Sequence, residues 1–92
     1  MMDAIATTTP PEVMRLRCQT HALMRAEERG VDIDVGAVVR LEAAIERLRA
    51  AWEVPGVDRY WFPIRLPRQR CRVLYDARLR CIVTVVPAPR LG

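Results

Sequence analysis

The segment that decides the fold is Glu53-Val54-Pro55-Gly56, because the spacing of apolar residues changes across it. Before this segment, apolar residues recur every three or four positions, as they do on one face of a helix. After it, they alternate with polar residues, as they do in a strand. Because proline and glycine interrupt both kinds of structure, the segment separates a helical N-terminal half from a β-rich C-terminal half.

Two helices are predicted in the N-terminal half. Thr9 and Glu12 have the spacing of a capping box, and Pro10 suits a first helical position, so we expect a helix over 10–29 that ends at Gly30. A second helix should begin after a cap at Asp32 or Asp34 and stop near Glu53. The residues expected on the core side are Val13, Leu16, Thr20, Leu23 and Met24 in the first helix, and Val38, Leu41, Ile45, Leu48 and Trp52 in the second. The second helix should turn Arg40, Glu42, Glu46, Arg47 and Arg49 towards water.

Three strands are predicted in the C-terminal half, over 59–66, 70–75 and 81–86. Pro63 and Pro67 restrict the first to an edge strand or an irregular one, whereas the β-branched residues of the third indicate a central strand buried on both faces. The short connection over 76–80 makes the last two strands a hairpin.

The predicted fold class is therefore α+β, with a helical hairpin packed on a small antiparallel sheet in the order (β)ααβββ. The optional first strand is residues 4–8. We expect a single domain over 1–92, with 1–9 and 88–92 weakly ordered.

Composition excludes several kinds of chemistry. The 92 residues contain 15 basic residues, all of them arginine, and 11 acidic ones, for a net charge of +4. There is no lysine and no serine, and His21 is the only histidine. A serine nucleophile, a pair of catalytic histidines and a P-loop lysine are thus excluded. The basic balance favours an acidic partner such as nucleic acid, although GC-rich coding would also yield many arginines.

One stripe of the first predicted helix carries groups suited to acid–base or phosphate chemistry. His21 and Arg25 are one turn apart, and Glu28 follows nearly on the same line. An imidazole can transfer protons near neutral pH, and arginine can neutralise a phosphate. The alternative is an ordinary boundary histidine beside a solvated Arg25–Glu28 pair.

Seven arginines lie among aromatic residues in the β half, a pattern that suits stacking and phosphate contacts with single-stranded RNA. They are Arg59, Arg65, Arg68, Arg70, Arg72, Arg78 and Arg80, and the aromatic residues are Tyr60, Trp61, Phe62 and Tyr75. Alternatively, the arginines guard a sheet edge and the aromatics form the core.

The three cysteines, Cys18, Cys71 and Cys81, favour free thiols in a reducing compartment. Together with His21 they could form a zinc site, but their spacing differs from that of usual closed sites. We expect no metal and no cofactor.

A short set of residues resembles small toxin-like domains of bacteria and phages. The pattern is His21-Ala22-x-x-Arg25-x-x-x-Arg29-Gly30-Val31, followed in the last strand by Val83-Thr84-Val85-Val86. Such domains resemble the RelE and BrnT ribonuclease toxins, whose helices pack on a small antiparallel sheet. Two features differ from such domains, in which the histidine follows a first strand within a few residues: here ten helical residues precede His21, and Pro63 and Pro67 interrupt a strand that should be regular.

The resemblance implies metal-independent RNA cleavage, with His21 as acid or base, Arg25 and Arg29 holding phosphate, and Thr84 beneath the scissile group. From the residues themselves we add Tyr75 to the catalytic group. Arg70, Arg72, Arg78 and Arg80 join Arg29 as expected RNA contacts.

The predicted function is RNA binding, with ribonuclease activity to be tested. The alternative is a small phage or mobile-element protein that binds and regulates a host protein without catalysis. Expected partners are RNA and either a cognate antitoxin or a host protein. No apolar run is long enough to cross a membrane, and no signal peptide is recognisable, so we expect a cytoplasmic protein.

Overall fold

The first helix ends where glycine permits a left-handed turn. A computed structural model describes residues 11–89, and in it α2 covers Pro11–Glu28. Gly30 follows with φ +73°, a backbone conformation that glycine adopts without steric cost. The N–H of Val31 donates to the carbonyl of Ala26 at 2.8 Å and closes the last turn. Thr9 and Pro10 lie outside the described residues, as do residues 4–8.

The second helical segment is divided into two helices. Asp34 is the N-cap of α3 (Val35–Arg47), and its side chain accepts a hydrogen bond from the Ala37 N–H at 2.8 Å. The backbone departs from helical geometry at Leu48, and the single turn α4 (Arg49–Trp52) follows. The helical part thus ends at the predicted place, just before Pro55 and Gly56.

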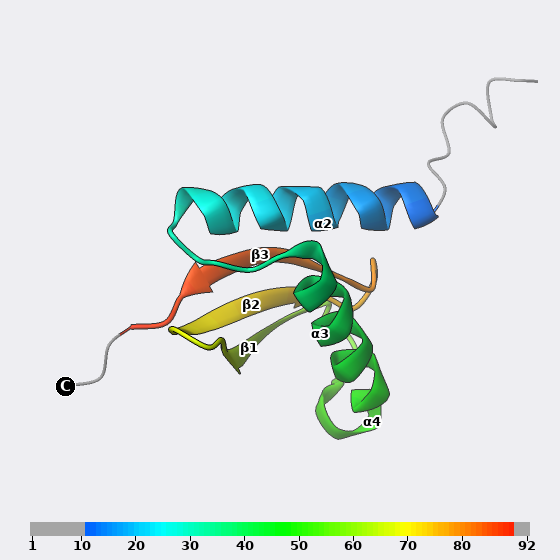
Figure 1. The fold of residues 1–92 in the computed structure, drawn as a ribbon. Coiled ribbons are helices and arrows are strands. Elements are labelled where there is room, and N and C mark those ends of the chain that lie inside the picture. Colours follow the sequence, from blue (N-terminus) through cyan, green and yellow to red (C-terminus); the bar gives the residue numbers. More distant parts are fainter. Residues whose placement is uncertain (1–10, 90–92) are drawn as a thin grey trace, which may run out of the picture.

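The β half forms a three-stranded antiparallel sheet in the order β1-β2-β3 (Figure 1). Its strands are β1 (Arg59–Arg65), β2 (Arg70–Asp76) and β3 (Cys81–Pro87). In the register of the sheet, Leu74 lies between Trp61 and Thr84, whereas Tyr75 lies between Tyr60 and Ile82. A bulge between Leu74 and Tyr75 therefore leaves Val83 without a partner on β2. The α+β fold and the hairpin of the last two strands are confirmed.

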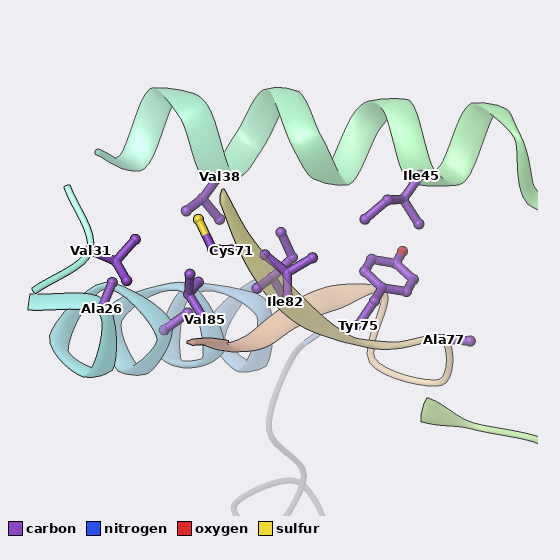
Figure 2. Close-up of a cluster of buried hydrophobic side chains, with 11 residues drawn as sticks. Ala26, Val31, Val38, Ile45, Cys71, Tyr75, Ala77, Ile82 and Val85 are labelled. Atoms are coloured by element: carbon purple, nitrogen blue, oxygen red, sulfur yellow. The ribbon is translucent and has the colours of Figure 1, made fainter. Parts of the chain in front are cut away.

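The core lies between one face of the sheet, α3 and the buried side of α2. Figure 2 shows Val38 and Ile45 of α3 directed towards Cys71, Ile82 and Tyr75 on the strands. Trp52 of α4 extends this core, because its ring meets those of three aromatic residues at centroid distances of 4.7 to 5.7 Å. The three residues are Tyr60, Phe62 and Tyr75.

The predicted core side of the first helix is wrong. Thr20 is exposed, as are Val13, Leu16 and Met24, and only Leu23 of the five residues is partly buried in the core. Ala22 and Ala26 are fully buried instead. Small side chains at these positions allow α2 to lie close along β3 (Figure 1), so the larger apolar residues point away from the sheet.

Two expectations for the second helix are also corrected. Leu48 is 62% exposed, because the break between α3 and α4 turns it out of the apolar stripe. Glu42 is buried rather than water-facing, since it lies four residues from Val38 and three from Ile45 on the core side of α3.

The predicted position of β3 in the sheet is wrong as well. β2 is the central strand, and β3 lies at an edge that α2 covers (Figure 1). Two side chains hydrogen-bond to the β3 backbone: Glu42 accepts from the Ile82 N–H at 2.8 Å, and Arg29 donates to the Val85 carbonyl at 3.1 Å. Helical cover of this edge explains why β3 has the buried, β-branched composition of a central strand.

Candidate nucleic-acid interface

One face of the sheet carries neither the aromatic core nor α3. Along β1, exposed residues alternate with the partly buried Tyr60, Phe62 and Ile64, and β2 alternates in the same way around Cys71 and Val73. Residues opposite each other in the register share a face, so the strands together define this second face. We call it the open face; its residues are Arg59, Trp61, Pro63, Arg65, Arg70, Arg72, Leu74, Asp76, Thr84 and Val86, together with Cys81, which is fully buried.

Trp61 is the exposed aromatic residue of the open face. Its side chain is 48% exposed, and the guanidinium carbon of Arg72 lies 5.2 Å from its ring centroid. This is the distance of a cation–π contact, which orients both groups. The other aromatic residues named for stacking, Tyr60, Phe62 and Tyr75, belong to the core.

Arg29 connects the end of α2 to the open face. Its Nη1 donates to the Thr84 hydroxyl at 2.9 Å and to the Val85 carbonyl at 3.1 Å. The structure thus brings together two residues, Arg29 and Thr84, that are 55 positions apart. The Thr84 hydroxyl oxygen therefore already accepts a hydrogen bond from the Arg29 guanidinium group.

His21 and Arg25 lie on the same flank of α2 as Arg29. The three residues recur every four positions, which places them in one row about 12 Å long beside the sheet. His21 is exposed, and Arg25 makes a 3.6 Å ion pair with Glu28 in which both side chains are about half exposed. The row therefore offers an accessible imidazole and two guanidinium groups, of which that of Arg29 reaches Thr84.

Tyr75 lies on the opposite side of the sheet from Thr84. Its side chain is fully buried under α3, and its hydroxyl donates to the carboxylate of Glu46. Burial and the neighbouring Glu46 raise the pKa of the Tyr75 phenol well above its ordinary value. The structure therefore does not bring Tyr75 together with His21, Arg25 and Thr84.

The predicted RNA-binding arginines separate into two groups. Arg70 and Arg72 belong to the open face. Arg78 is exposed in the β2–β3 turn, where its N–H donates to Asp76. Arg80 closes that turn with a left-handed φ of 57°, and its Nε lies 4.0 Å from Glu46, on the α3 side of the sheet.

Sequence reasoning missed a buried polar cluster behind the open face. Glu42 accepts hydrogen bonds from the Gln19 amide at 2.6 Å and from the Ile82 N–H at 2.8 Å. Burial raises the pKa of the Glu42 carboxyl above its ordinary value, against these hydrogen bonds and the charge of Arg15. Its helical spacing with Val38 and Ile45 was the signal that could have found it. The cluster joins α2, α3 and β3, and all its described polar groups are hydrogen-bonded.

Residues 11–89 contain no group of three or more His, Cys, Asp or Glu side chains that could hold a metal ion. Cys18 of α2 lies beside the buried Cys81 of β3, whereas Cys71 is buried on β2 and His21 is exposed on α2. Within the same part of the chain, no helix is long and apolar enough to span a membrane. Comparison with protein-family models, curated proteins and solved structures finds no match to this chain.

Proposed function

We propose that this protein binds single-stranded RNA on the open face of its sheet. The observation that carries the proposal is the exposed Trp61 ring held against Arg72 within a group of arginines. Unpaired bases stack on exposed aromatic rings, while guanidinium groups neutralise the phosphates between them.

The charge of the open face supports an anionic polymer as the ligand. Arg59, Arg65, Arg70 and Arg72 lie on this face, and Arg29 reaches its border at Thr84. The single carboxylate of the open face, Asp76, is buried and already bound to Arg59 at 3.2 Å and to two backbone N–H groups. The local charge is therefore strongly positive although the whole chain carries only +4.

Fluorescence anisotropy with a short labelled single-stranded RNA tests this proposal. Trp61→Ala should weaken binding by roughly 5- to 150-fold, the loss expected for one base–aromatic stack of about 1–3 kcal/mol. Arg47→Ala is the matched control for Arg72→Ala, because Arg47 is an exposed arginine at the end of α3, away from this face. Equal affinities of the wild type, Trp61→Ala and Arg72→Ala would overturn the proposal.

RNA cleavage is a second step that the row on α2 could perform. His21 is the accessible acid–base group, and Arg25 and Arg29 are the candidate phosphate contacts beside it. The same labelled RNA, incubated with wild type, His21→Ala and Arg25→Ala, decides the matter. Cleavage that is lost in His21→Ala supports catalysis, whereas equal background cleavage by all three proteins leaves an RNA-binding protein without ribonuclease activity.

A protein partner is the second candidate function, and one observation favours it. Val13, Leu16 and Met24 form an exposed apolar stripe along the outer side of α2, with Leu16 and Met24 more than half exposed. A partner recognised through this stripe should be retained after nuclease treatment and lost from the double variant Leu16→Glu/Met24→Glu. Loss of bound material on nuclease treatment would instead favour RNA.

A further inference from the structure

A pocket of about 400 Å³ lies at the corner of the open face where β1 and β2 meet the C-terminal segment. Pro63, Ile64, Ala88 and Pro89 supply apolar walls, and the buried Cys71 also lines it. The Ala88 N–H donates to the Arg70 carbonyl at 3.0 Å and so fixes one wall beside the start of β2. The volume is near the lower end of small-ligand pockets, which run from roughly 300 to 1,000 Å³.

Three arginines line this pocket, and no Asp or Glu among residues 11–89 does. They are Arg65, Arg70 and Arg72, and none of the three forms an ion pair within residues 11–89. The tight β1–β2 turn pairs Arg65 with Arg70 across the two strands, so both side chains start from the same corner. Three further pockets of the described chain differ, because each has carboxylates in its lining: Asp32 and Asp34, Glu42 and Glu46, or Asp58 and Asp76.

Arg72 connects this pocket to the stacking residue. It lines the pocket and also lies over the ring of Trp61, which is two residues before Pro63 on β1. The pocket and the ring are therefore about 7 Å apart along the strand, since a strand advances roughly 3.3 Å per residue. One ligand can fill the pocket with an anionic group and place an attached ring on Trp61.

We infer that this pocket binds the terminal phosphate monoester of an RNA strand, with the adjacent base stacked on Trp61. This inference rests on the proposed RNA binding and names the part of the RNA that the open face recognises. A phosphate monoester carries a charge of about −1.5 to −2 at neutral pH, whereas each internal phosphodiester carries about −1. Three guanidinium groups that form no ion pair among residues 11–89, and that can bind phosphate oxygens in pairs, favour the more highly charged end.

Competition binding with RNAs that differ only at their ends tests the inference. The three competitors share one short sequence: one has hydroxyls at both ends, one carries a 5′-phosphate and one carries a 3′-phosphate. One of the two phosphorylated RNAs should compete about tenfold or more better than the RNA with two hydroxyl ends, and which of the two does so identifies the end that is bound. Equal competition by all three RNAs would overturn the inference while leaving RNA binding by the open face intact. Failure of every RNA to bind would overturn both.

Variants of the pocket residues distinguish recognition of the terminal phosphate from general electrostatic attraction between RNA and the arginines. In Arg65→Ala and Arg70→Ala, the ratio of the affinities for phosphorylated and hydroxyl-ended RNA should fall towards one. Arg70→Lys should keep only part of the preference, because lysine retains the charge but loses the planar guanidinium group that binds two oxygens. Arg47→Ala should retain the full preference. The three arginines are exposed, so circular dichroism should show that all variants are folded. An unchanged preference in Arg65→Ala and Arg70→Ala would contradict the assignment of the pocket.

Discussion

Glu42 is a buried carboxyl whose pKa depends on its surroundings. It is buried on α3, yet it binds the backbone of β3 and the side chain of Gln19. Burial raises its pKa in the folded chain above the ordinary 4.5, so between these two pKa values the native state holds more protons than the unfolded state. The free energy of unfolding contributed by this group must therefore fall as pH rises through that window.

Substitution of Glu42 by glutamine tests this pH dependence. Glu42→Gln cannot titrate, so the wild type should be at its most stable relative to the variant below about pH 4.5 and lose that advantage as pH rises. Urea midpoints of both proteins across the acidic and neutral range provide the comparison. Parallel pH profiles would show that Glu42 does not titrate differently in the folded chain.

The three thiols should differ in reactivity. Burial raises the pKa of Cys71 and Cys81, so each forms little of the reactive thiolate in the folded protein. Cys18 is only partly buried on α2. With an aromatic disulfide reagent under native conditions, we expect one thiol to react at least about tenfold faster than the other two. The fast phase should disappear in Cys18→Ala; its persistence there would show that a sheet cysteine is accessible.

At the scale of elements, two glycines should respond oppositely to the same substitution. Gly30 has φ +73°, and an added Cβ would contact nothing within 4 Å, so Gly30→Ala introduces backbone strain alone, of about 1–2 kcal/mol. Gly36 lies in the first turn of α3, where an added Cβ would be 3.3 Å from the flexible guanidinium tip of Arg40. Alanine there should stabilise the helix by about 0.5–1 kcal/mol.

Thermal unfolding measures this contrast directly. For a chain of this size, 1 kcal/mol corresponds to a shift of about 4–8 °C in Tm. Gly30→Ala should lower Tm and Gly36→Ala should raise it. A rise in Tm for Gly30→Ala would show that the turn after α2 does not need a left-handed residue.

Local signals in the sequence predicted the elements of the fold well, whereas contacts between elements were harder to predict. Glycine and proline mark the helix ends, and the alternation after Gly56 predicts the strands, because both effects depend on neighbouring residues. The side of α2 that faces the sheet could not be predicted in this way. Its largest apolar residues suggested one face, but the close packing allowed by Ala22 and Ala26 selected another.

For the candidate site too, the residues could be predicted from the sequence, but the contacts between elements could not. The arginines and Trp61 could be named from the sequence, and the strict alternation along β1 contains the information that separates Trp61 from Tyr60 and Phe62. The contact between Arg29 and Thr84 required the tertiary structure, since it joins α2 to β3 across 55 residues. Tyr75 was grouped with Thr84 because the two lie on neighbouring strands, but the bulge and the register place them on opposite faces of the sheet.

At the scale of the whole molecule, the charges are distributed unevenly. The face of the sheet under α3 packs against the core and the buried carboxylate of Glu42, whereas the open face carries arginines around Trp61. The α2 helix covers the β3 edge (Figure 1), and Arg29, just after this helix, reaches the border of that face at Thr84. The fold thus concentrates positive charge on one surface of a chain whose net charge is modest.

The salt dependence of RNA affinity tests the central claim most directly, because it counts the phosphates that the protein neutralises. For single strands, the slope of log affinity against log salt concentration is about −0.7 per phosphate contact. We predict a steep negative slope for the wild type, a slope shallower by about 0.7 for Arg72→Ala, and no change for Arg47→Ala. Identical slopes for Arg72→Ala and the wild type, or an equal loss in Arg47→Ala, would contradict RNA binding by the open face.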